Sequence, residues 1–109
     1  MAYDQGLAQI LRDELAAETV VEKRMMGGLS FMWRGHMLCG VHSVGTAMFR
    51  VGAANMAETL TIAGVVPMAF TGRPMAGFVD ATAEACVDDA RRGRLMALAR
   101  GFVGGLPPK

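Results

Sequence analysis

The sequence predicts an α+β domain in which an antiparallel β-sheet meander of four to five strands is flanked by an N-terminal helix and a C-terminal helix. Apolar residues at helical spacing occur near both ends of the chain. Short apolar segments separated by glycine-containing turns occupy the middle. A length of 109 residues is enough for one hydrophobic core but not for two, so we expect residues 1–109 to form a single domain.

The N-terminal helix is predicted to run from about residue 3 to about residue 17. Its apolar positions recur at helical spacing and comprise Tyr3, Leu7, Ile10, Leu11 and Leu15. Asp4 lies near the start, where a negative charge interacts favourably with the helix dipole. The resulting apolar stripe is expected to pack on the sheet.

Four strands are predicted next, at residues 20–26, 29–33, 36–42 and 47–51. The first three are joined by the two-residue links Gly27-Gly28 and Arg34-Gly35. Hairpins this tight need positive φ in the turn, which glycine adopts without steric cost. Apolar residues alternate with others in the second segment, as expected for a sheet with one face on the core.

The second half of the chain predicts a short helix, a short extended piece, a segment compatible with a fifth strand, and a long final helix, at residues 53–62, 68–70, 75–81 and 87–104. The final helix carries apolar residues at i, i+3, i+4, i+7 and i+8, namely Leu95, Leu98, Ala99, Phe102 and Val103. The Gly104-Gly105 pair is expected to end this helix.

The composition argues against several functional classes. Eleven Lys and Arg against ten Asp and Glu give a formal charge of +1, so nucleic-acid binding is neither indicated nor excluded. The longest apolar stretch, residues 60–70, is about half of what a membrane span needs. The N-terminus lacks the features of a secretory signal, so we expect a cytoplasmic protein whose Cys39 and Cys86 are buried thiols.

One cluster resembles a set of metal ligands, His36-x-x-Cys39-x-x-His42. On a regular strand His36 and His42 would share one face, roughly 20 Å apart, and Cys39 would face the other way. We therefore expect no metal site and no Cys-His nucleophile. Gly-x-Ser-x-Gly and glycine-rich phosphate-binding motifs are missing from the sequence, so no catalytic residue and no cofactor is predicted.

Two surfaces are candidates for binding. Ten methionines are many for this length; they would fill the core, or a subset would form an adaptable apolar surface for a partner helix or an oily ligand. The second candidate is a set of arginines with the loop residues beside one of them: Gly72, Arg73, Pro74, Arg91, Arg92 and Arg94.

Arg73 lies between turn residues, where its guanidinium would reach a carboxylate or phosphate of a ligand, or pair within its own domain. Arg91, Arg92 and Arg94 form the only basic cluster of the sequence. Because residues at this spacing point in different directions around a helix, we expect a solvated surface there rather than a phosphate cleft.

Four ordered segments are similar to the TfoX N-terminal domain family: EKRMMGGLSFM at residues 22–32, MFRVG at 48–52, PMAFTGRPMAGF at 67–78 and LPPK at 106–109. TfoX, also called Sxy, regulates natural competence genes in bacteria. The resemblance implies a compact α+β domain, no enzymatic activity, and a stand-alone version of a domain that is followed by a second one in the family's regulators.

The resemblance therefore implies a regulatory or protein-binding module related to competence and transcription regulators, with another protein as its partner. Two alternatives remain at this point: a domain that binds nucleic acid directly, and a small-molecule binder with a methionine-lined pocket. A homo-oligomer is compatible with the sequence.

Overall fold

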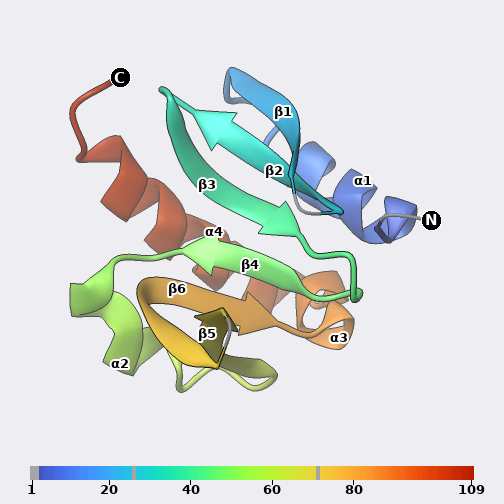
Figure 1. The fold of residues 1–109 in the computed structure, drawn as a ribbon, viewed down its shortest axis with the longest axis vertical. Helices are drawn as coiled ribbons and strands as arrows, with labels where there is room; N and C mark the ends of the chain where they lie inside the picture. Colours follow the sequence, from blue (N-terminus) through green and yellow to red (C-terminus); the bar gives the residue numbers. More distant parts are fainter. Residues whose placement is uncertain (1–2, 26, 71) are drawn as a thin grey trace.

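The computed structural model describes residues 3–25, 27–70 and 72–109 and confirms the α+β class (Figure 1). Its elements are α1 (Gln5–Glu14), β1 (Val20–Met25), β2 (Gly28–Trp33), β3 (His36–Val41), β4 (Ala47–Arg50), η1 (Ala53–Asn55), α2 (Met56–Thr59), β5 (Val65–Phe70), β6 (Arg73–Ala81), α3 (Ala83–Val87) and α4 (Asp89–Gly104). Met26, predicted at the end of the first strand, and Thr71, in the predicted turn, lie outside the described residues.

The six strands form one antiparallel sheet in the order β1-β2-β3-β4-β6-β5, which is more strands than the four to five predicted. The first four strands form the predicted meander. β5 lies outside β6 at the edge of the sheet and begins at Val65, three residues before the predicted extended piece. Pro67 lies within β5, and an edge strand tolerates a proline because it does not need every backbone N–H for pairing.

A β-bulge in β3 makes the predicted alternation of residues 36–42 wrong. Phe31 pairs with Cys39 whereas Met32 pairs with Met37, so Leu38 is an extra residue on β3. Both Leu38 and Cys39 are fully buried in the core. The bulge therefore shifts the pleat by one residue, and His36 lies on the core side together with Cys39.

The two histidines consequently lie on opposite faces of the sheet. The His36 imidazole Nε2 is 2.7 Å from the carbonyl oxygen of Pro107, in the segment that follows α4. The His42 imidazole Nε2 is instead 2.8 Å from a carboxylate oxygen of Asp80 on β6. The prediction that His36 and His42 share one face, with Cys39 on the other, is therefore wrong: His36 shares its side with Cys39, and His42 does not.

The helices are shorter and more divided than predicted. α1 begins after Asp4, whose carboxylate accepts a hydrogen bond from the backbone N–H of Leu7, and ends at Glu14 rather than near residue 17. The predicted 53–62 helix contains only η1 and α2. The predicted 87–104 helix begins at Asp89, because Asp88 is extended and caps α4 through the N–H of Arg91.

The core lies between the sheet and a layer formed by α1, α3 and α4. α4 packs against β3 and β4, and α1 packs against β3 and α3 (Figure 1). The largest fully buried side chains of the core include Phe31 and Phe49 from the sheet and Leu11, Leu95 and Met96 from the helices. The opposite face of the sheet carries none of these three helices, so its side chains are available to line a surface site.

Candidate functional site

A groove of about 460 Å³ lies on the sheet face opposite α1, α3 and α4. Five of the ten methionines line it, together with one aromatic ring. We call this surface the methionine groove and define it by Met25, Met37, Met48, Met68, Met75 and Phe78. Part of the high methionine content is therefore gathered on one surface of the described structure.

The floor of the groove is built around Met48 on β4, which is 4% exposed. Met48 pairs with Gly40 on β3 and with Asp80 on β6. A Cβ atom at Gly40 would lie 2.6 Å from the backbone carbonyl oxygen of Leu29, so this position admits only glycine without a shift of the sheet. The glycine keeps the floor low between β2 and β4.

The walls of the groove are less buried than its floor. Met68 joins Met48 among the buried residues, whereas Met25, Met37 and Met75 are half-buried. Methionine is unbranched and polarizable, so half-exposed methionine walls can adjust to differently shaped apolar groups. The groove thus has a fixed floor and adaptable walls.

A polar pair interrupts the apolar lining. The His42 imidazole Nε2 and the Asp80 carboxylate Oδ1 are 2.8 Å apart, with side chains 30% and 24% exposed. His42 follows β3 and Asp80 lies on β6, so the pair spans the intervening strand β4. In the part of the chain that the structure describes, His42 is the side chain bonded to this carboxylate, which keeps acceptor capacity for a further donor.

Sequence reasoning missed this pair. The two residues are 38 positions apart, and His42 was assigned to the same face as His36 because the bulge was not foreseen. The five groove methionines were not separated from the others for a similar reason. The alternation of side chains along a strand places Met48 and Asp80 on the same face only once the pairing of β4 with β6 is known.

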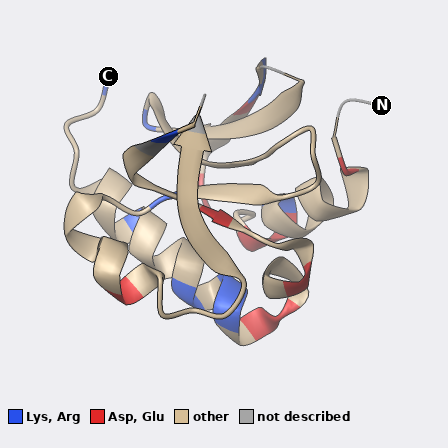
Figure 2. Cartoon of the chain, turned by 60° about the horizontal axis from the view of Figure 1, so that its bottom comes forward, with Lys and Arg blue, Asp and Glu red and all other residues tan. Residues whose placement is uncertain are grey.

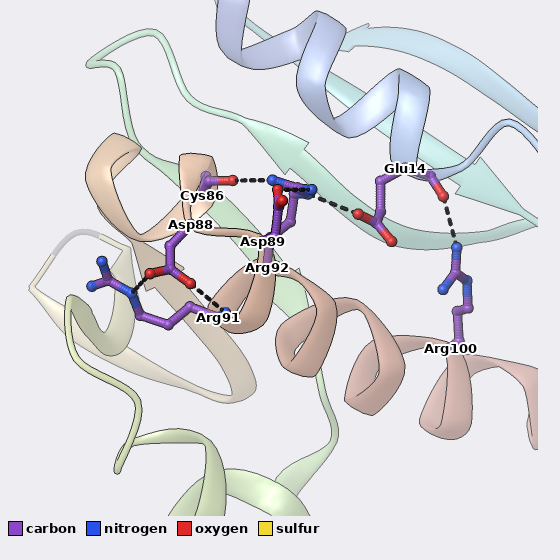
Figure 3. A network of polar contacts seen from close by, with 7 residues as sticks. All are labelled: Glu14, Cys86, Asp88, Asp89, Arg91, Arg92 and Arg100. Atoms are coloured by element: carbon purple, nitrogen blue, oxygen red, sulfur yellow. Dashed lines mark hydrogen bonds and ion pairs between the residues drawn. The ribbon is translucent and has the colours of Figure 1, made fainter.

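Arg92 is paired with groups of its own domain. Its guanidinium donates hydrogen bonds to the Glu14 carboxylate of α1 at 2.7 Å, to Asp89 at 2.8 Å and to the Cys86 carbonyl at 2.9 Å (Figure 3). The hydrogen bond with Glu14 is the main reason that the pKa of Arg92 is raised. Its charge is therefore used to join α4 to α1 and α3.

The other two arginines of the cluster also face acidic side chains. Arg91 pairs with Asp88 at 3.4 Å and donates to the Ala63 carbonyl at 3.1 Å, and Arg94 lies 3.9 Å from a Glu58 oxygen. A backbone hydrogen bond from Arg91 is the main reason that the pKa of Asp88 is lowered. In Figure 2 blue segments of the helical layer accordingly lie beside red ones, and this pairing leaves little unbalanced positive charge for a phosphate backbone.

Arg73 is exposed and lies at the first position of β6, opposite Phe70 in the β5–β6 hairpin. Gly72 precedes it with φ of 79°, as the predicted turn requires, and Pro74 continues the strand. Arg91 instead contacts Ala63, just before the start of β5. The length of β5, about 17 Å for five steps from one residue to the next, separates this contact from the hairpin turn beside Arg73. The structure therefore separates the two groups of residues that the sequence analysis placed in one candidate set.

The described residues contain no group of three or more His, Cys, Asp and Glu side chains arranged to hold a metal ion. Cys39 and Cys86 are free and buried, as expected. Burial raises the pKa of both thiols, that of Cys86 to about 11, so both are protonated at neutral pH. Among the described residues no helix combines the length and the apolar character needed to cross a membrane.

Comparison with known proteins adds a family assignment. The family model described as the TfoX N-terminal domain matches residues 13–101, a range that includes all six strands and most of α4. The comparison with curated proteins gave no match, and neither did the comparison with solved structures.

Proposed function

This chain belongs to the TfoX N-terminal domain family, and on that premise we propose that it is a regulatory module that binds a partner protein in the methionine groove. The observation that carries the proposal is the position of the groove, on the sheet face that α1, α3 and α4 leave open. The family relationship supports a role related to competence and transcription regulators in the bacterial cytoplasm.

The apolar lining gives the groove a driving force for association. Full burial of a methionine side chain contributes roughly 1.5–3 kcal/mol relative to its exposure to water. Met25, Met37 and Met75 are already half-buried, so covering them would contribute on the order of 3 kcal/mol together, before the costs of association are subtracted. This magnitude suits a reversible regulatory contact.

The reactive groups of the domain support binding rather than catalysis. A nucleophilic cysteine needs a thiolate, and burial raises the pKa of both Cys39 and Cys86. The remaining polar pair of the groove, His42 and Asp80, is adjacent to apolar side chains rather than to a described thiol. We therefore propose a non-enzymatic module.

The test compares two charged substitutions on opposite sides of the domain. Met37→Glu puts a charge on a half-buried wall of the groove, whereas Val87→Glu changes a side chain that is 57% exposed at the end of α3. Each variant is first checked for a native NMR spectrum. We then expect quantitative pull-downs to recover a specific partner with the wild type and with Val87→Glu, and to lose it with Met37→Glu. Recovery of the same partners by all three proteins would contradict the proposal.

A small-molecule binder is the second candidate, because a volume of about 460 Å³ lies within the range of roughly 300–1,000 Å³ typical of small-ligand sites. An apolar ligand screen with the same variants separates it from the first candidate. Saturable binding that raises the melting temperature of the wild type and of Val87→Glu, but not that of Met37→Glu, would support it. A screen in which no compound distinguishes these variants would argue against it.

A further inference from the structure

We infer that the partner segment bound by the methionine groove is an amphipathic helix whose apolar face carries one Lys or Arg, and that Asp80 selects this basic side chain. The inference rests on the proposed function and specifies the chemistry of the partner. It follows from the backbone of the groove floor, from the two edges of the sheet, and from the charges that line the groove.

The groove floor cannot add a strand from a partner. Met48, at its centre, pairs on one side with Gly40 and on the other with Asp80, so the sheet itself already uses the backbone at this position. A bound segment meets only side chains there. It must therefore satisfy its own backbone N–H and C=O groups, which an α-helix does and an extended peptide does not.

The two edge strands are also poor sites for strand addition. β5 contains Pro67, which has no backbone N–H to donate. β1 presents three consecutive exposed charged residues, Glu22, Lys23 and Arg24. Proline and charged residues are the features by which sheet edges avoid pairing with another chain. Recognition through the sheet face is thus favoured over recognition at its edges.

The charge of the groove selects the kind of helix. Asp80 and His42 are the ionisable residues of the described lining, and neither Lys nor Arg belongs to it. Lys23, opposite Ser30 on β1, is exposed at the rim, where water screens its charge. The guanidinium of Arg50 also borders the groove, but it lies 5.6 Å from the centres of both the Phe78 and the Phe102 rings, so its charge is directed to these two rings.

The position of Asp80 favours binding of a cationic side chain and disfavours binding of an anionic one. Its side chain is 24% exposed and lies beside Met48, its neighbour on β4. When a helix covers the groove and displaces water, the local dielectric constant falls, and a carboxylate then interacts more strongly with charges of either sign. A Lys or Arg that reaches it forms a charge-assisted hydrogen bond, whereas a Glu is repelled.

The inference is tested with the full chain and three labelled amphipathic peptides that are identical except for Lys, Leu or Glu at the centre of the apolar face. Binding is measured by fluorescence anisotropy at low and at high salt. We expect the Lys peptide to bind the wild type about tenfold more tightly than the Leu peptide, the Glu peptide to bind most weakly, and the difference to shrink at high salt. Asp80→Asn should remove the preference for the Lys peptide over the Leu peptide.

The matched control is Asp89→Asn, which removes a carboxylate that is 91% exposed on α4 and does not line the groove. This variant should keep the preference for the Lys peptide. A preference that persists in Asp80→Asn, or that is lost equally in Asp89→Asn, would overturn the inference. Equal binding of all three peptides, weakened alike by Met37→Glu, would also overturn it while supporting the groove as a docking site. If no peptide binds, the inference fails, and the pull-down comparison alone then judges the proposed function.

Discussion

Replacement of Arg92 by methionine tests whether the basic cluster on α4 is part of the scaffold. Methionine retains an unbranched stem and a similar helix propensity, so the change removes mainly the guanidinium. The Arg92 and Glu14 side chains are only 16% and 23% exposed, and their atoms are 2.7 Å apart. A hydrogen bond to a charged group contributes about 1.5–3 kcal/mol net, and the exposed Asp89 adds little, so we expect a loss of about 2 kcal/mol. For a domain of this size that loss lowers the melting temperature by roughly 8 °C.

The control is Arg94→Met, two residues along the same helix. The Arg94 side chain is 51% exposed and lies 3.9 Å from Glu58, so its replacement should cost about 0.5 kcal/mol or less. Urea unfolding gives both free energies, and a double-mutant cycle with Glu14→Gln isolates the coupling to Arg92, which we expect to exceed about 1 kcal/mol. Equal stabilities of the two arginine variants would refute the structural role and return Arg92 to the list of candidate binding residues.

Three further predictions concern the sheet, a thiol and an ion pair. Gly40→Ala forces a Cβ against a backbone carbonyl at 2.6 Å and should destabilise the domain by roughly 1–3 kcal/mol, whereas Gly93→Ala, with no neighbouring atom within 4 Å, should stabilise it by about 0.8 kcal/mol in the same urea experiment. Cys86, whose pKa burial raises to about 11, should react with a thiol reagent at pH 8 only after unfolding; fast reaction of the native protein would contradict its burial. A hydrogen bond from Arg12 lowers the pKa of Glu22, so the stabilisation from this pair is present at neutral pH and lost as the pH falls below roughly 4.3 through the lower folded value. Since both side chains are about one-third exposed, the acid-dependent part should be about 0.5 kcal/mol or less, and Glu22→Gln should abolish it in unfolding curves at pH 3–7.

The strands that the sequence predicted well are those with strong local turn signals. Gly27 and Gly35 adopt φ of 79° and 83°, and Arg34-Gly35 links β2 to β3 as predicted. Gly28, predicted in the first link, is instead the first residue of β2 and pairs with Met25. β5 was recognised only in part because Pro67 argues against a strand unless the strand is known to lie at an edge. Edge position is a property of the whole sheet and has no local signal.

For the final helix, the prediction failed at its first residues, although local signals were present there. Its apolar periodicity was correct from Leu95 onward, but its start was placed before Asp88. Aspartate is a good residue for the first turn of a helix and also a good cap, and the sequence does not distinguish these roles. The extended backbone at Asp88 separates α4 from α3, a short helix that is capped by Thr82 and that the sequence analysis did not predict.

To predict the candidate site, one would have to know which residues far apart in the sequence lie next to one another in the fold. Composition suggested an adaptable methionine surface but not which methionines would meet. Met37 and Met75 face the same groove because β3, β4 and β6 are neighbours, although the chain between β4 and β6 includes two short helical segments and β5. The contact between His42 and Asp80 has the same origin. None of these proximities follows from spacing along the chain.

The extra residue Leu38 also determines how β3 can change during evolution. Because the bulge shifts the pleat, tolerance to substitution along this strand should not follow a period of two. Packing in the core should constrain substitutions at both Leu38 and Cys39, whereas the lining of the groove should constrain those at Met37. Deletion of Leu38 alone would remove one buried side chain and restore regular alternation, with Met37 still at the groove and both His36 and Cys39 still on the core side. Leu38 is therefore the position in this strand where a deletion keeps both faces in place, whereas a deletion at a paired position would move side chains between the core and the groove.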